Sequence, residues 1–243
     1  KQPLQACLNE EETPGGSIMP NKCTRLGFAG FCKTDIILYL ARILTCLGES
    51  VAIVDLSGEQ GLRLSVPAGI YSDDRLDYRG VEVFLNCANN SVTEETQSNH
   101  SMVLLDYGVN TKALESMKEL RTLFIVTDLQ RHHAVPLASF LEHLQGPTDS
   151  VRIIRDIVPG KIRPRYIDSL LQAGQHTNLL AKYEFSFDGV EYSQRLLSQY
   201  DDIFRFTKIT ESFKSMLLEI IVELLGYDRK TAVKAFKKAQ HGG

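Results

Sequence analysis

Short, continuous apolar runs recur along this chain and alternate with stretches whose apolar residues follow a helical period. The runs lie at residues 23–30, 50–56, 81–86, 101–108, 121–128, 150–157 and 182–187. Runs of this kind are typical of strands that are buried on both faces of a parallel sheet. Parallel strands need crossover connections, which place helices on both faces of the sheet. The sequence therefore predicts an α/β fold with a mostly parallel, twisted sheet.

Helical spacing is clearest after the first run, where apolar residues recur from Ile36 to Leu47 and Gly48 is placed to cap the helix. Further helices are expected at residues 110–120, 134–145, 164–174, 191–204 and 209–226. No internal repeat interrupts the pattern, so we expect a single domain over residues 22–243 that ends in helices. Residues 1–21 are acidic and rich in glycine and proline, which predicts a flexible leader, part of it added ahead of a natural start at Met19.

Composition and charge exclude several classes of protein. The 243-residue chain is 43% hydrophobic and 23% charged, as expected of an ordinary globular protein. No apolar run is long enough to span a membrane, and the net charge of −3 gives no general attraction for nucleic acid. Five cysteines without C-x-x-C spacing indicate reduced thiols rather than disulfides, and hence a cytoplasmic location.

The junction between the first run and the first helix, GFAGFCKT at 27–34, is the main candidate site. It is similar to the phosphate-binding pattern G-x-x-x-x-G-K-[ST], in which backbone amides hold phosphates, the lysine reaches the terminal phosphates and the hydroxyl binds Mg²⁺. The alternative is an ordinary strand-to-helix turn whose glycines serve only tight packing. The candidate nucleotide-binding residues here are Gly27, Gly30, Cys32, Lys33 and Thr34.

Two carboxylates stand at the ends of later runs. Asp55 follows VAIV and Asp106 follows MVLL. The carboxyl ends of parallel strands meet at one edge of the sheet, where ligands bind in such folds. With Thr34, these carboxylates are candidate ligands for Mg²⁺.

In order and spacing, these segments resemble the ParA/MinD family of P-loop ATPases. The resemblance rests on GFAGFCKT, on VAIVDLSGEQGLRLSV at 51–66, on MVLLDYG at 102–108 and on LFIVTDLQRHHAVPLASFLEHL at 123–144, and covers about residues 23–225. The family includes CpaE, a pilus-assembly relative that is often degenerate. The resemblance implies seven or eight mostly parallel strands, ATP or ADP with Mg²⁺ as cofactor, and a dimer that encloses ATP. Family members position cellular machinery on membranes or on nucleoid DNA.

Two residues of the candidate loop depart from the family pattern. The lysine that crosses the dimer interface in relatives is Phe28 here, which offers neither charge nor donor. The glycine before Lys33 is Cys32, whose Cβ costs about 1–2 kcal/mol in the left-handed region. A reactive, low-pKa thiolate at this position is the less favoured interpretation of the cysteine.

Two further departures concern hydrolysis and base recognition. The second carboxylate of the family's D-x-D is Ser57, which cannot take up a proton from water at neutral pH, although Glu59 could substitute after a shift of the loop. The asparagine that reads adenine is replaced by Arg155, which could stack on a base or pair with a phosphate. We therefore include Arg155 among the nucleotide-binding candidates, together with Asp55.

Three remaining segments give weaker indications. His132 and His133 are interpreted as solvated loop residues, because no second ligand pair is spaced for zinc. The basic segment 161–166 is expected to be a solvated loop that could contact phosphate or an acidic partner. The basic C-terminal segment is expected to form an exposed or partner-docking helix, with weak membrane contact as the alternative. Its apolar side is formed by Ala232, Val233, Phe236 and Ala239.

These features predict a degenerate ParA/MinD-like protein with weak or no ATP hydrolysis. The expected role is binding, positioning or assembly in a membrane-associated machine of the pilus, secretion or conjugation type. The alternative is an active ATPase that dimerises with ATP and positions cargo on membrane or DNA. Expected partners are a second copy or a related chain and a protein of the assembly, not nucleic acid. The expected location is the cytoplasm, including its membrane surface, and a protein without any nucleotide stays an open alternative.

Overall fold

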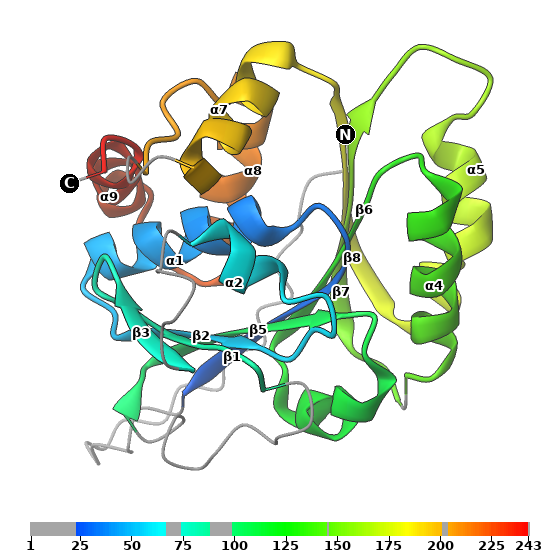
Figure 1. Cartoon of the computed structure of the whole chain (residues 1–243), viewed down its shortest axis with the longest axis horizontal. Coiled ribbons are helices and arrows are strands. Elements are labelled where there is room, and N and C mark those ends of the chain that lie inside the picture. The colour runs from blue at the N-terminus through cyan, green and yellow to red at the C-terminus, as the bar shows by residue number, and fades with distance from the viewer. Residues whose placement is uncertain (1–22, 67–73, 88–98, 145, 201–203, 243) are drawn as a thin grey trace.

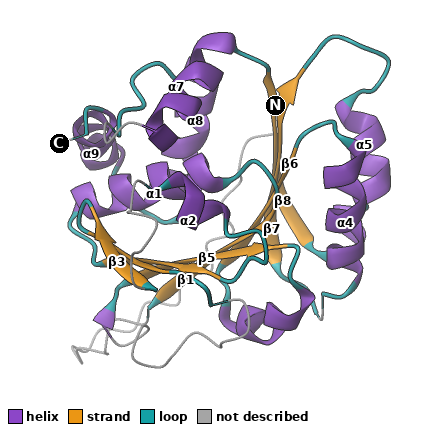
Figure 2. Ribbon diagram, viewed as in Figure 1, coloured by secondary structure: helices purple, strands orange, loops and turns teal. Residues whose placement is uncertain are grey.

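The computed structural model describes residues 23–66, 74–87, 99–144, 146–200 and 204–242, which form one eight-stranded sheet with helices on both faces (Figures 1 and 2). The strand order is β3-β4-β2-β5-β1-β6-β7-β8, and every neighbouring pair is parallel except β3 with β4. The strands are β1 (Thr24–Gly30), β2 (Val51–Asp55), β3 (Arg75–Tyr78), β4 (Val81–Phe84), β5 (Met102–Gly108), β6 (Thr122–Thr127), β7 (Asp149–Ile157) and β8 (Asn178–Ser186). This confirms the expected fold class.

Helices cover the two faces of the sheet (Figure 1). One face carries α1 (Thr34–Leu47), α2 (Gly61–Ser65), α7 (Gly189–Tyr200), α8 (Glu211–Glu219), its π-helical continuation η2 (Ile220–Leu224) and α9 (Arg229–Gln240). The other carries the 3₁₀ segment η1 (Thr111–Glu119) with α4 (Arg131–Glu142), α5 (Pro164–Leu171) and α6 (Ala173–His176). Each face therefore has its own apolar core, as a sheet that is buried on both sides requires.

α1 is the helix that sets the position of the candidate loop. Its apolar residues repeat at helical spacing, and almost the whole helix is buried between the sheet and α9. Gly48 ends it in the left-handed conformation, with φ of +100° and backbone bonds to Leu44 and Thr45. Since each fully buried leucine or isoleucine contributes about 1.5–3 kcal/mol, this packing fixes the start of α1 at Thr34 firmly against the sheet.

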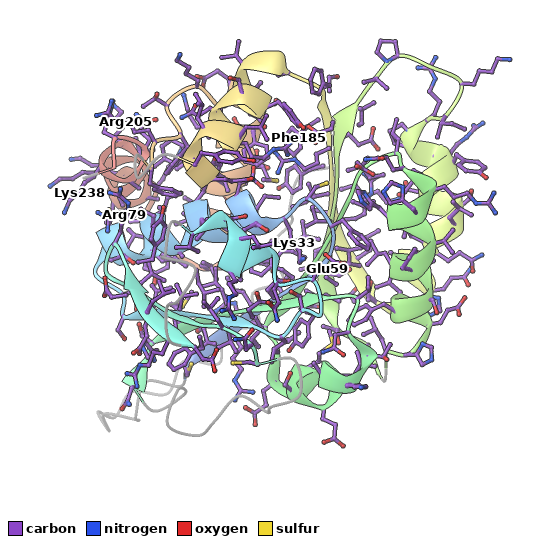
Figure 3. All side chains as sticks on the ribbon, viewed as in Figure 1. Lys33, Glu59, Arg79, Phe185, Arg205 and Lys238 are labelled. Carbon is purple, nitrogen blue, oxygen red and sulfur yellow. The ribbon has the colours of Figure 1, made fainter. Side chains whose placement is uncertain are left out.

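The C-terminal helix differs from the expectation of an exposed or membrane-contacting helix. Ala232, Phe236 and Ala239 of α9 are buried in the core that α1 also lines. The apolar side is therefore not available to a membrane in the folded chain, and lysines such as Lys238 lie on the opposite, exposed side (Figure 3). None of the described helices combines the length and apolar character needed to cross a bilayer.

Several element boundaries also differ from the sequence prediction. The helix expected at 164–174 ends at Leu171, because Gln172 adopts a left-handed conformation with φ of +46°. His132 and His133 lie in the first turn of α4 and not in a loop. The antiparallel edge strand β3 was not predicted. The predicted leader at 1–21 lies outside the described residues.

Candidate functional site

The junction between β1 and α1 is the segment in which the sequence predicts a phosphate-binding loop. β1 continues through Gly30, and only residues 31–33 connect it to α1. Residues 27–30 pair with β6 on one side, and residues 27–29 with β5 on the other, so their backbone groups take part in the sheet. The amide of Phe31 donates to the carbonyl of Val126 at 2.9 Å. The backbone of the first half of the candidate loop is thus already used within the sheet.

Packing accounts for the residues at the start of this segment. Phe28, which stands where relatives have a lysine, is fully buried and stacks on Phe124 with ring centroids 4.8 Å apart. A Cβ at Gly27 would lie 2.6 Å from Cδ1 of Leu120. Gly27 therefore serves close packing on the η1 side of the sheet. This agrees with the alternative interpretation of the segment, in which the glycines serve only tight packing.

Lys33 and Asp106 form a buried ion pair at the carboxyl edge of the sheet. The Nζ of Lys33 lies 2.9 Å from Oδ1 of Asp106, and the exposed fractions of the two side chains are 4% and 1%. Glu59 lies close to Lys33 in the view of Figure 3 and is exposed. Thr34 lies beside this pair in sequence, and its hydroxyl faces Gly61 at the start of α2. The positive charge of Lys33 is thus directed at a carboxylate of its own chain.

Asp55 adjoins this pair because β2 and β5 are neighbours in exact register, with Asp55 opposite Asp106. Oδ1 of Asp55 accepts bonds from the amide and the hydroxyl of Ser57, at 3.0 and 2.6 Å. The Oδ2 atoms of both aspartates are buried without a hydrogen-bond partner among the described residues. Burial, followed by the negative charge of Asp106, raises the pKa of Asp55 to about 6. Two orphaned carboxylate oxygens are donors that suit Mg²⁺, but Lys33 already neutralises one of the two charges.

We expect Asp55→Asn to raise the free energy of unfolding at pH 7 by about 1–3 kcal/mol in buffer with EDTA. A raised pKa means that the folded state prefers protonated Asp55. This stabilising effect is fully present below about pH 4, the ordinary pKa, and is lost as the pH rises through about 6. Asparagine resembles the protonated carboxyl group, so the gain should appear at pH 7 and vanish at pH 4. Urea unfolding at both pH values measures it.

The control for this prediction is Glu142→Gln, which removes an exposed carboxylate far from the pair. Its effect should stay within about 0.5 kcal/mol at both pH values. Loss of stability in Asp55→Asn at pH 7 would mean that the folded protein needs the charge of Asp55, and would contradict the expected sign.

Cys32 adopts the left-handed backbone conformation, which is unfavourable for a residue with a Cβ. Its φ is +55°, in the left-handed region, although it carries a Cβ. Burial, followed by the negative charge of Asp128, raises the pKa of the Cys32 thiol to about 12. This direction is opposite to that of a reactive thiolate, so the less favoured interpretation of the cysteine is wrong for this state of the protein.

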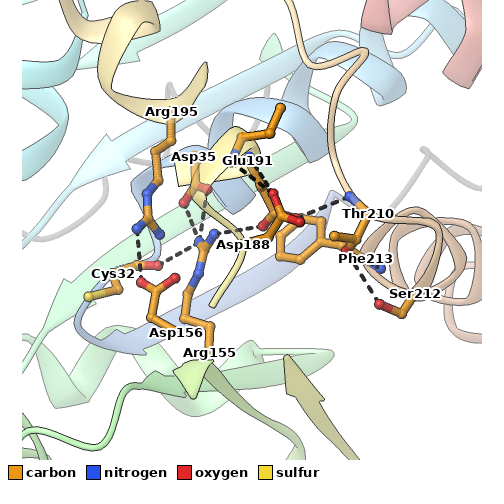
Figure 4. A network of polar contacts seen from close by, with 11 residues as sticks. Cys32, Asp35, Arg155, Asp156, Asp188, Glu191, Arg195, Thr210, Ser212 and Phe213 are labelled. Carbon is orange, nitrogen blue, oxygen red and sulfur yellow. Dashed lines mark hydrogen bonds and ion pairs between the residues drawn. The ribbon is translucent and has the colours of Figure 1, made fainter. Parts of the chain in front are cut away.

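Arg155 lies at the centre of the polar network in Figure 4. Its guanidinium donates to both carboxylate oxygens of Asp35, at 2.7 and 2.8 Å, and to the backbone carbonyl of Cys32 at 3.0 Å. Glu191 of α7 lies 3.3 Å away, and the ring of Phe213 packs under the cation. Burial opposes the charge, but Asp35 outweighs it and holds the pKa of Arg155 above its ordinary value. Contact of Arg155 with a nucleotide remains a prediction, since the described contacts of this side chain are to its own chain.

A large cavity opens beside this network, with a volume of about 830 Å³. Its polar wall includes Cys32, Asp128 and Arg195, and its apolar wall includes Leu38 and Phe187. Asp55 and Asp106 are not among the residues that line the cavity. The predicted residues therefore separate into a buried charge cluster of Lys33, Asp55 and Asp106, and a cavity wall that includes Cys32 and Thr34.

No protein-family model and no curated protein matches this sequence. Solved structures are similar in fold. A ParA family ATPase from Chlorobium tepidum TLS has a TM-score of 0.52 at 12% identity, over 92% of this chain and 100% of that chain. A putative plasmid partition protein from Borrelia burgdorferi B31, bound to AMPPNP, has a TM-score of 0.51 at 10% identity, over 89% and 99%. Apo McdA from Cyanothece has a TM-score of 0.51 at 10% identity, over 89% of this chain and 99% of that chain. The chain therefore has the fold of a ParA family ATPase.

Proposed function

We propose that this chain is a degenerate ParA/MinD-like P-loop protein that binds or positions a protein partner and hydrolyses ATP weakly or not at all. The observation that carries the proposal is the state of Lys33, whose ammonium is paired with buried Asp106 at 2.9 Å. A lysine that binds phosphate must leave this partner, and Asp106 would then lie buried without a countercharge. Separating a buried pair in this way costs about 3–5 kcal/mol unless a cation replaces the lysine.

Two further observations support weak or absent hydrolysis. The backbone of residues 27–31 is hydrogen-bonded as a strand, so wrapping a triphosphate would require breaking part of the central ladder. Ser57 donates its hydroxyl to Asp55 and offers no carboxylate to position an attacking water. The chain thus combines the fold of an ATPase with a junction whose lysine is paired with Asp106 and whose position 57 is a serine in place of a carboxylate.

The setting in a membrane-associated pilus, secretion or conjugation machine rests on the family resemblance alone. A cytoplasmic location, and dimers with a second copy or a related chain, belong to the same proposal. The competing function is that of an active ATPase that dimerises when it binds ATP.

The test is titration of the full chain with ATP and Mg²⁺ by calorimetry, combined with a phosphate-release assay and light scattering. We expect no turnover above the background of buffer, and a molar mass that does not change with ATP. A ligand at 100 times its Kd would stabilise the folded chain by about 2.7 kcal/mol and raise the thermal midpoint. We expect no such rise at millimolar ATP.

The matched pair of variants is Lys33→Ala and the double variant Cys32→Gly with Ser57→Asp. The first removes the only basic side chain of the candidate loop, and the second restores two residues of the family pattern. Turnover in the wild type that disappears in Lys33→Ala would establish an active ATPase and overturn the proposal. Turnover that appears only in the double variant would support the proposal. It would mean that the fold can hydrolyse ATP and that the residues at positions 32 and 57 prevent it in the wild type.

A further inference from the structure

Three side chains of different chemistry meet at the wall of the large cavity. They are Cys32 from the junction after β1, Asp128 directly after β6, and His133 from the first turn of α4. The Sγ of Cys32 lies 3.7 Å from Oδ2 of Asp128, and Nδ1 of His133 lies 3.0 Å from Oδ1 of the same carboxylate. All three candidate ligand atoms lie within 4.8 Å of one another.

These separations are close to those of a tetrahedral zinc site. Zinc binds sulfur at about 2.3 Å and nitrogen or oxygen at about 2.0–2.2 Å, so its ligand atoms lie about 3.3–3.6 Å apart. The separations of 3.7 and 3.0 Å end on the two different oxygens of Asp128 and lie within a few tenths of an ångström of that range. The remaining pair of ligand atoms lies within 4.8 Å. A thiolate, an imidazole and a carboxylate together favour zinc over Mg²⁺ or Ca²⁺, which prefer oxygen alone.

We propose that Cys32, Asp128 and His133 bind one zinc ion through three protein ligands, with the fourth position open to the cavity. The sequence analysis interpreted His133 as a solvated loop residue. It could not show Cys32 as a neighbour of His133, because Cys32 lies 101 positions earlier in the chain. The proposal does not depend on nucleotide binding. It also assigns a function to the residue that replaces the loop glycine of the family pattern.

The surroundings of the three ligands are those of a supported metal site. Gln130 donates its backbone amide and its side-chain amide to the two carboxylate oxygens of Asp128, each at 2.8 Å. The ring of Phe31 stacks on that of His133 with centroids 4.4 Å apart, which fixes the plane of the imidazole. Outer contacts of this kind orient ligands and typically contribute a factor of about 10–100 to metal affinity.

The cavity supplies an entry path and an exchangeable position. Cys32 and Asp128 both line it, so an ion held by them is reached from the cavity without opening the core. Sites with three protein ligands and one open position keep water or another donor as the fourth ligand.

Zinc binding must displace the proton of the Cys32 thiol, because the thiolate is the ligand. As the sulfur–zinc bond forms, the proton passes to buffer.

The experiment uses the full chain, freed of metal with EDTA and kept reduced with a phosphine. Zinc chloride is titrated against a competing chromogenic chelator, and Co²⁺ is added separately as a spectroscopic probe. We expect one zinc per chain, and with Co²⁺ the visible bands of tetrahedral cobalt together with a sulfur-to-cobalt charge-transfer band. Zinc should also protect Cys32 from alkylation, as read by peptide mass spectrometry on the wild-type protein.

Each ligand variant has a matched control in the chain. Cys32→Ser and His133→Gln should each lower zinc affinity by more than the factor of about 10–100 that a lost outer contact costs. Cys46→Ser removes a thiol of α1 outside the cluster, and His132→Gln removes the adjacent imidazole; both should bind zinc as the wild type does. Circular dichroism verifies that the variants are folded, and the alkylation measurement needs no variant at all.

Two results would overturn the proposal. One is zinc binding that is absent, or equally strong in Cys32→Ser and the wild type. The other is alkylation of Cys32 at the same rate with and without zinc. The remaining interpretation would then be that Asp128 and His133 form a simple ion pair next to a buried thiol.

Discussion

Gly30→Ala is expected to lower the free energy of unfolding by more than about 4 kcal/mol, or to prevent folding altogether. A Cβ at this position would lie 2.0 Å from the carbonyl oxygen of Val126 and 2.9 Å from Cδ2 of Leu137. The carbonyl cannot move away cheaply, because it belongs to the central strand β6 and accepts the amide of Phe31. The residue also has φ of +97°, a conformation that side chains with a Cβ rarely adopt. Urea unfolding followed by circular dichroism measures the loss.

Gly48→Ala separates these two causes. Gly48 has nearly the same backbone angle, with φ of +100°, but a Cβ there would meet no atom within 4 Å. Its substitution should therefore cost only the conformational penalty of about 1–2 kcal/mol. If Gly30→Ala were as mild as Gly48→Ala, the close approach of β1 to β6 would not exist in solution. The extension of β1 through the predicted loop, which is one support of the proposed function, would then be wrong.

The fold could be predicted because its strands differ sharply in composition from its helices. The run VAIVD became β2 and the run MVLLDYG became β5, since residues buried on both faces must be apolar throughout. The edge strand β3 escaped prediction for the same reason. Its sequence RLDY is largely exposed and carries polar residues, so nothing in its composition distinguishes it from a loop.

The sequence could predict the candidate site only for residues that stand at the ends of strands. Asp55 and Asp106 lie opposite each other because parallel strands that are neighbours end at the same edge. Two features could not be predicted in this way. The strand-type run at 23–30 and the loop motif at 27–34 overlap at residues 27–30, and only pairing with β5 and β6 decides for the strand there. The partners of Cys32 and of Asp35 come from positions about 100 or more residues later in the chain.

Arg155→Met is the second substitution with a large expected effect, a loss of about 3–5 kcal/mol in the free energy of unfolding. Arg155 and Asp35 are almost fully buried, with exposed side-chain fractions of 2% and 6%. Removing the arginine leaves the carboxylate of Asp35 without its main partner in the interior, and removes the contact with Phe213 as well. Guanidinium or urea unfolding at pH 7 measures the change.

Arg195→Met is the matched control, since Arg195 belongs to the same network (Figure 4) and pairs with Asp156 at 2.8 Å. Asp156 is 25% exposed, so water can solvate it when its partner is lost, and the cost should stay near 1 kcal/mol. The double variant Asp35→Asn with Arg155→Met should recover much of the loss, because it leaves no unpaired buried charge. Equal losses in the two single variants would show that burial does not set the cost. Without recovery in the double variant, the role of Arg155 would lie in holding the carbonyl of Cys32, and zinc affinity should then fall together with stability.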